Sequence, residues 1–148
     1  MSAVPPAAAQ AFPQTPGIAR RLASMLYEAI LLFAVGFLAT WVFQLAAGTV
    51  QIEGWRLRLL QAFLLAVFAA YFLWCWLRGG QTLAMKTWRI RLVARGNVPL
   101  SARAALLRFV YAVALVPTLV GLVWALFDRD RQFLHDRLAG SALVLLSP

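Results

Sequence analysis

The stretch LASMLYEAILLFAVGFLATWVFQLAAG, Leu22–Gly48, decides the fold class because it holds a single charged residue, Glu28. A second stretch, LLQAFLLAVFAAYFLWCWL at Leu59–Leu77, holds none, and a third at Phe109–Phe127 is also uncharged. A helix needs about 20 mostly apolar residues to cross the hydrocarbon core of a bilayer. The sequence therefore predicts an all-α integral membrane protein with three hydrophobic helical segments.

The composition agrees with a membrane location. Hydrophobic residues make up 63% of the 148 and charged residues 13%, against about 25% charged residues in soluble domains. The excess of 14 Lys and Arg over 5 Asp and Glu lies at segment ends and in one loop, where topology and anionic lipid place basic residues. We therefore expect contact with the lipid bilayer and anionic lipid headgroups, and no nucleic-acid partner.

The first part of the chain differs from the rest. Residues 1–17 contain four of the seven prolines and no charge, and they lack the pattern of a signal peptide. We expect a disordered N-terminal tail over residues 1–17 and one transmembrane domain over residues 18–148.

The basic residues also predict an orientation. Eight of them precede the first span, directly follow the second or lie in the stretch 81–103, whereas the link 49–58 between the two spans holds only Arg56 and Arg58. By the positive-inside rule, the N-terminus and the stretch 81–103 are expected to be cytoplasmic.

The third segment allows two arrangements. A full span would place the residues after Asp128 outside, together with three arginines, against the charge rule. Pro117 and Gly121 in its middle would also allow a re-entrant segment whose break is buried in protein. We favour the full span because each half of the segment would be very short, and the side of residues 128–148 stays open.

A short strand is expected between the second and third segments. Apolar and basic residues alternate over Thr87–Ala94, and Arg95-Gly96-Asn97 follows as a turn. Because a lone strand needs a partner, the apolar run Ala142–Leu146 is the candidate for pairing with it.

Glu28 is the first candidate site residue. It lies seven residues, or two helical turns, after Arg21 and therefore on the same helix face. A carboxylate at this depth is expected to face the protein interior, with Arg21 or Arg108 as its partner. One interpretation is a proton or cation site, and the other, which we favour, is an ion pair that fixes the helix register.

A second candidate group is formed by His135, Asp136 and Arg137. A neighbouring His and Asp could act as a general base or a metal ligand, but Ser141 lacks the spacing of a nucleophile. We expect a polar turn at the membrane surface that caps a short helix, with no catalytic residue. One Cys and one His also exclude an internal disulfide and a zinc site built by this chain alone, so we expect no metal and no cofactor.

Four motifs in order resemble the RDD family of small bacterial membrane proteins. They are Arg20–Ala23 with Glu28 seven residues after Arg21, Gly80–Lys86 continuing into Arg89–Val93, Leu106–Arg108, and His135–Ser141. The resemblance extends from Arg20 to Leu146. The chain differs from the family pattern at three positions, where Glu28 replaces an aspartate, Ala84 a glycine and Ser141 a threonine.

The resemblance implies a function only in outline. It suggests a bacterial inner-membrane protein that assists transport, with cation/proton exchange as one form of it. Three spans enclose little polar space, so a transport role predicts a homo-oligomer or association with a partner membrane protein. The alternative is a membrane adaptor or scaffold that binds a partner protein and transports nothing; an enzyme is not expected.

Overall fold

The structure is a computed structural model that describes residues 15–47, 54–94, 96–118, 120–127 and 133–146. Of the expected disordered tail, residues 1–14 lie outside this range. Residues 15–17 lead directly into the first helix, and Pro16 among them is buried.

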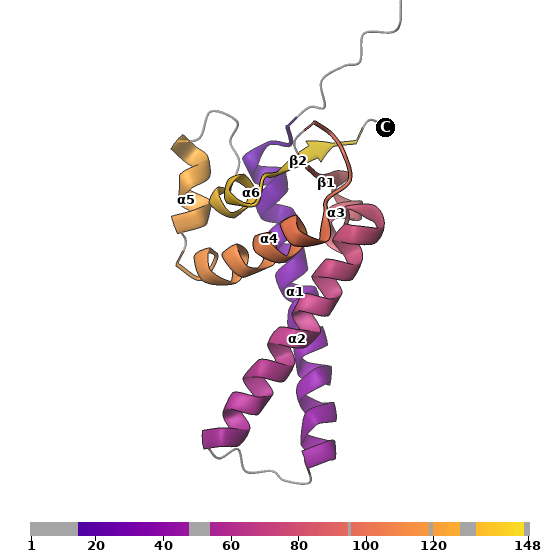
Figure 1. Cartoon of the computed structure of the whole chain (residues 1–148), viewed down its shortest axis with the longest axis vertical. Helices are drawn as coiled ribbons and strands as arrows, with labels where there is room; N and C mark the ends of the chain where they lie inside the picture. Colours follow the sequence, from indigo (N-terminus) through magenta and orange to yellow (C-terminus); the bar gives the residue numbers. More distant parts are fainter. Residues whose placement is uncertain (1–14, 48–53, 95, 119, 128–132, 147–148) are drawn as a thin grey trace, which may run out of the picture.

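Two long helices form a hairpin (Figure 1). Helix α1 (Ile18–Ala47) has 30 residues and α2 (Gly54–Gly79) has 26, so at 1.5 Å per residue both exceed the roughly 30 Å of a hydrocarbon core. Both are apolar enough to cross a membrane. Residues 54–58, which the sequence placed in the link between the spans, form the start of α2.

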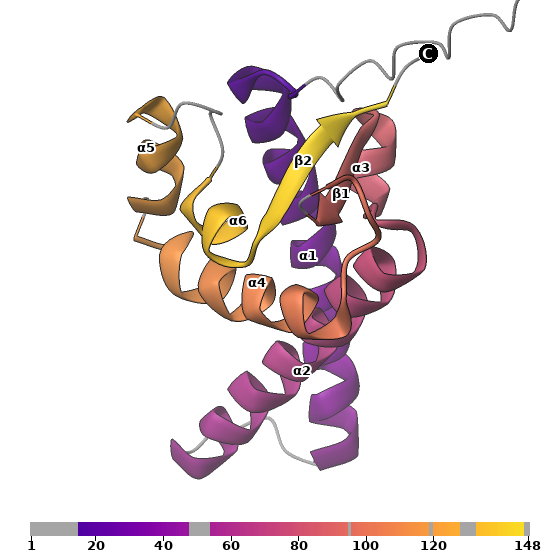
Figure 2. The ribbon, with the colours of Figure 1, turned by 45° about the horizontal axis from the view of Figure 1, so that its top comes forward.

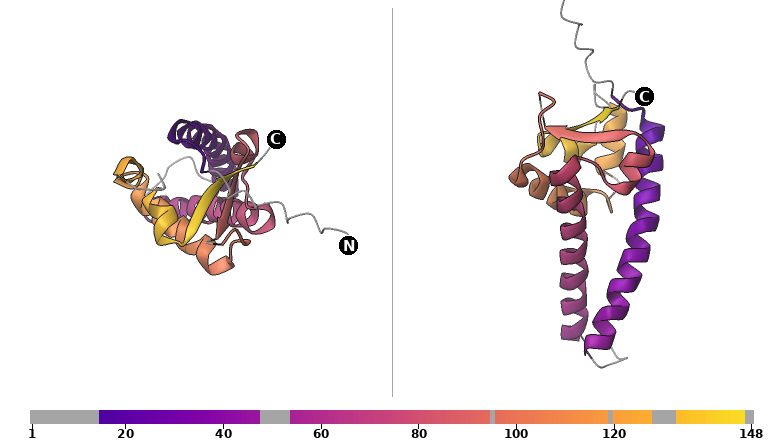
Figure 3. Two further views of the ribbon diagram at one scale, coloured as in Figure 1. Left: turned by 90° about the horizontal axis from the view of Figure 1, so that it is seen from above. Right: turned by 90° about the vertical axis from the view of Figure 1, so that its right-hand side faces the viewer.

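The remaining elements gather at the end of the hairpin where α1 begins and α2 ends (Figures 2 and 3). We call five of them the cap: α3 (Leu83–Thr87), β1 (Ile90–Ala94), α4 (Ala102–Leu115), α6 (Leu134–Leu138) and β2 (Ser141–Leu145); the other, α5 (Val120–Phe127), contacts α4 and α6. The two strands pair antiparallel, from Ile90 opposite Leu145 to Ala94 opposite Ser141.

The packed core lies within the cap and against the end of α2. It joins the end of α2 to the strands and α4 through eight buried residues: Trp76, Met85, Ile90, Leu92, Leu100, Ala105, Phe109 and Leu143. The buried residues of α1 all belong to its first eleven positions, and they are Arg21, Ser24 and Glu28. Beyond them α1 exposes large apolar side chains such as Phe33, as a surface for lipid or another helix requires.

A glycine turn connects α2 to the cap. Gly80 has a φ of +67°, and a Cβ there would lie 2.6 Å from the carbonyl oxygen of Leu92. The backbone N–H of Leu92 donates to the carbonyl oxygen of Gly80 at 2.7 Å, which fixes this close approach. The chain then enters α3 with Thr82 as its N-cap, whose hydroxyl accepts from the backbone N–H of Met85.

The segment expected to form a third full span instead forms parts of two short helices. Helix α4 ends at Leu115, and α5 (Val120–Phe127) follows after a break that contains Pro117. Proline has no N–H for the helical ladder, and its ring clashes with the carbonyl four residues earlier. With 14 and 8 residues, α4 and α5 are about 21 Å and 12 Å long, too short to span.

This break decides where the later residues lie. Because neither α4 nor α5 crosses, α6 and β2 return to the cap, at the same end of the hairpin as the start of α1 (Figure 1). The three-span interpretation, which sent residues 128–148 to the opposite side, is therefore wrong for the described residues 133–146.

Candidate functional site in the cap

A cavity of about 410 Å³ lies between α1, α2 and the cap. Its volume falls in the range of small-molecule sites, about 300–1,000 Å³. Most of its wall is apolar. The polar and charged residues that line it are Arg21, Ser24, Glu28, Arg108 and His135, and they include four of the six site residues predicted from the sequence.

Two hydroxyl groups hold Glu28. Tyr71 of α2 donates its hydroxyl to Oε1 at 2.7 Å, and Thr82 donates its hydroxyl to Oε2. Glu28 is only 9% exposed, so the carboxylate ties α1, α2 and the start of α3 together. The interior position expected for Glu28 is present, but Arg108, one of its two expected partners, bonds elsewhere.

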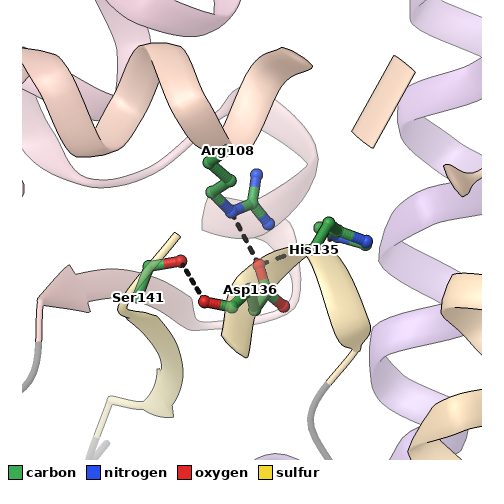
Figure 4. Close-up of polar contacts among 4 residues, drawn as sticks. All are labelled: Arg108, His135, Asp136 and Ser141. Carbon is green, nitrogen blue, oxygen red and sulfur yellow. Dashed lines mark hydrogen bonds and ion pairs between the residues drawn. The ribbon is translucent and has the colours of Figure 1, made fainter. Parts of the chain in front are cut away.

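Arg108 pairs with Asp136. Nε of Arg108 donates to Oδ1 of Asp136 at 2.7 Å, and the two side chains are 7% and 0% exposed (Figure 4). The guanidinium of Arg108 also stacks on Trp76, with its central carbon 4.3 Å from the ring centroid. A charge-assisted hydrogen bond combined with cation–π stacking fixes Arg108 at the cavity wall.

Arg21 lies in the same wall. It is 1% exposed, and its guanidinium carbon lies 5.9 Å from the ring centroid of Phe133. Phe133 in turn stacks on the imidazole of His135 at 5.5 Å between ring centroids. The residues just before and inside α6 therefore meet the first turn of α1.

His135 is neutral at pH 7. Burial lowers its pKa to about 4; the carboxylate of Asp136 opposes this shift, and the charge of Arg108 adds to it. Nε2 of His135 lies 3.7 Å from Oδ1 of Asp136, longer than a hydrogen bond. Nδ1 has no hydrogen-bond partner among the described residues.

The buried imidazole predicts a loss of stability in mild acid. The pKa of His135 is lower in the folded protein than its ordinary value of 6.5, so the unfolded chain takes up the proton first. Stability should be full above pH 6.5 and fall as the pH drops toward 4. By pH 5 the free energy of unfolding should be about 2 kcal/mol lower, from 1.36 kcal/mol per pH unit.

Unfolding of detergent-solubilised protein at pH 7.5 and pH 5 measures this loss. His135→Gln, which cannot titrate, is the control and should lose far less stability over the same interval. An equal loss in the wild type and in His135→Gln would contradict the assignment to His135.

Two other residues that the sequence singled out, Ser141 and Arg137, do not line the cavity. Ser141 donates its hydroxyl to the backbone carbonyl of Asp136 at 3.1 Å, which ties the start of β2 to α6 (Figure 4). This bond is not the nucleophile–base contact of a hydrolase. Arg137 is exposed. No cluster of three His, Cys, Asp or Glu residues that could hold a metal ion occurs among the described residues.

Three residues of the site were not predicted from the sequence. Tyr71 and Thr82 bond to Glu28, and Trp76 covers Arg108. A weak signal existed for two of them. Tyr71 is the one hydroxyl-bearing residue in the run Leu59–Leu77, and Thr82 follows a Gly-Gly stop in an N-cap position.

Comparisons with known proteins give a family and no individual relative. No curated protein and no solved structure matches the sequence at a significant level. The sequence model of the RDD family matches residues 15–140, which include Arg21, Glu28, Arg108 and Asp136, and the chain therefore belongs to the RDD family.

Proposed function

We propose that this RDD-family membrane protein assists transport and that Glu28 takes up and releases the proton linked to it. The observation that carries the proposal is the position of Glu28, a carboxylate of a membrane-spanning helix in the wall of a cavity. Ionisable groups in such helices are costly to bury and mark proton and ion paths.

The two hydroxyls around Glu28 suit a group that changes its protonation state. Tyr71 and Thr82 donate to the carboxylate in this structure. A hydroxyl oxygen also accepts hydrogen bonds, so the same neighbours can bond to a protonated carboxyl after rotating. The site can therefore keep its hydrogen bonds in both states.

A proton suits the site better than a metal cation. Glu28 is the one carboxylate that lines the cavity among the described residues, and Arg21 and Arg108 line it too. Hard cations take six or more oxygen ligands, and two neighbouring guanidinium groups oppose their binding. Exchange of a cation for a proton would thus need ligands from another protomer or protein.

The proposal includes an oligomer. Helices α1 and α2 contact one another closely, for example at Gly36, where a Cβ would lie 3.2 Å from the ring of Phe68. The cavity lies at the cap end and is lined by the first half of α1. A path across the bilayer therefore requires helices from further protomers or from a partner membrane protein, and cross-linking in native membranes should show species above the monomer.

Orientation and localisation belong to the same proposal. We place the protein in a bacterial inner membrane with the N-terminus and the cap on the cytoplasmic side. The cap end carries most of the basic residues outside the spans, in agreement with the positive-inside rule. We also propose that the protein is not an enzyme, because Ser141 bonds to a backbone carbonyl and not to His135.

Glu28→Gln tests the proton role. We expect the wild type, reconstituted in vesicles with a trapped pH dye, to move protons when a pH gradient or a Na⁺ or K⁺ gradient is imposed. Glu28→Gln should accumulate normally and lose this flux, because the amide has the shape of the carboxyl but no titration. Glu28→Asp should retain part of the flux.

Glu53→Gln is the matched control, since it makes the same chemical change at a carboxylate that precedes the first residue of α2 in the sequence. It should leave the flux unchanged. Poor accumulation of Glu28→Gln would instead support a structural role for Glu28. Normal accumulation with undiminished flux would refute the proton role.

A membrane adaptor is the second candidate. Helix α5 favours it, because this short helix outside the core exposes Val120, Trp124 and Phe127, the last at 82%. An exposed apolar patch of this kind also suits contact with another protein. A stoichiometric partner that co-purifies with the wild type, and is lost in Phe127→Ser, would favour the adaptor if vesicles show no flux.

A further inference from the structure

We propose that the cavity binds an anionic phospholipid, with the phosphate of the headgroup beside Arg108 and one acyl chain between α1, α2 and α4. This assignment goes beyond the proposed function, because it holds whether or not the protein transports anything. It rests on the division of the cavity into a donor-rich end and an apolar end.

The donors at this end of the cavity lack acceptors within the described residues; Oδ2 of Asp136 also has no hydrogen-bond partner, but Asp136 is 0% exposed and does not line the cavity. Arg108 gives its Nε to Asp136, and none of the described residues accepts a hydrogen bond from its two terminal nitrogens. Trp76 is 3% exposed and its indole Nε1 has no partner within the described residues. The indole nitrogen and the guanidinium only donate, so both require an acceptor from outside this part of the protein.

His135 adds a third polar side chain to the same end. It is 3% exposed and lines the cavity, and its Nδ1 lacks a hydrogen-bond partner among the described residues. The neutral ring can present an N–H there. Figure 4 shows Arg108 and His135 on neighbouring elements, both close to Asp136.

Glu28 does not meet this need. Its two carboxylate oxygens already accept from Tyr71 and Thr82. Asp136 binds Arg108 through Nε alone and does not bond to the two terminal nitrogens of the guanidinium. A phosphate offers several acceptor oxygens and negative charge, and a guanidinium binds it with two parallel N–H bonds.

The other end of the cavity is apolar and suits an acyl chain. Three helices supply it: Leu32 of α1, Leu65 and Phe68 of α2, and Val113 of α4. Leu32, Leu65 and Phe68 belong to the membrane-spanning helices. Free inorganic phosphate would leave this wall uncovered, whereas a lipid of the surrounding bilayer brings a chain to it at the depth where its headgroup meets the cap.

The first test is native mass spectrometry of the full chain in a neutral maltoside detergent. The probes are phosphatidylglycerol, phosphatidylcholine and inorganic phosphate. We expect retained adducts with phosphatidylglycerol at a concentration where phosphatidylcholine and phosphate leave none. Equal retention of the two lipids, or retention of inorganic phosphate alone, would overturn the proposal.

Two variants test the two ends of the cavity. Trp76→Phe removes the indole N–H and keeps an aromatic ring under Arg108, so it should weaken phosphatidylglycerol binding about tenfold. Trp74→Phe makes the same change on an exposed tryptophan of α2 and should have no effect. Unchanged phosphatidylglycerol binding in Trp76→Phe would contradict a headgroup site beside Arg108.

Ala112→Phe fills the apolar end, because Ala112 lines the cavity. It should abolish adducts with phosphatidylglycerol, and Ala114→Phe, at an exposed position of α4 outside the cavity lining, should leave them intact. Equal retention in both variants would show that the lipid binds elsewhere on the protein. The vesicle flux of the wild type is measured separately, so loss of lipid binding and loss of transport are distinguishable.

Discussion

Asp136→Asn is expected to lower the free energy of unfolding by about 3–5 kcal/mol, the usual cost of removing one member of a buried ion pair. Asp136 is 0% exposed and accepts the 2.7 Å bond from Arg108. The asparagine keeps the shape but leaves the guanidinium of Arg108 buried without its counter-charge. Thermal unfolding in detergent and the amount of protein in the membrane measure the loss.

Two controls isolate the pair. Arg137→Gln changes an exposed charge on the same short helix and should shift stability by less than about 1 kcal/mol. The double replacement Arg108→Met with Asp136→Leu removes both charges and should recover most of the stability that Asp136→Asn loses. An unchanged free energy of unfolding in Asp136→Asn would show that the ion pair does not stabilise the fold.

Gly80→Ala has the second largest expected effect, about 2–5 kcal/mol. The sum has two parts, roughly 1–2 kcal/mol for an L-residue with a left-handed backbone and roughly 1–3 kcal/mol for steric crowding. Gly80 has a φ of +67°, and its new Cβ would lie 2.6 Å from the carbonyl oxygen of Leu92. Because Thr82 follows two residues later, the strain should also displace the hydroxyl that bonds to Glu28.

Gly79→Ala is the matched control for this change. A Cβ at Gly79, the last residue of α2, would meet nothing within 4 Å. We expect Gly79→Ala to be neutral or slightly stabilising, because alanine favours the helix. Equal stability of the two variants would show that the turn tolerates a side chain at Gly80.

The sequence was a good guide to the two long apolar helices α1 and α2, because a bilayer selects on length and hydropathy, and both are visible in one segment at a time. It also placed Glu28 toward the protein interior from the cost of a charge in lipid alone. The hydroxyl groups of Tyr71 and Thr82, which bond to Glu28, were not predictable in this way. They lie 43 and 54 residues away along the chain, and only the packing of α2 and α3 against α1 brings them together.

The third segment shows the limit of hydropathy. Phe109–Phe127 is as apolar as a spanning helix, yet α4 and α5 stop on either side of Pro117. Hydropathy measures preference for lipid or for protein interior and does not separate the two. The proline and the misplaced arginines of a three-span topology were the better signals. The argument against a break assumed two very short halves, but α4 begins at Ala102, before the apolar run, and has 14 residues, whereas only α5, with 8, is short.

The pairing of β1 with β2 also sets an order for biosynthesis. The hairpin of α1 and α2 leaves the ribosome first and can enter the bilayer while β1 still has an unpaired edge. Asp136 and the strand that covers β1 are synthesised afterwards. Until they arrive, Arg108 has no counter-charge and the edge of β1 is open to pairing with another chain. We therefore expect the newly synthesised chain to expose the edge of β1 for as long as translation takes to proceed from β1 to β2.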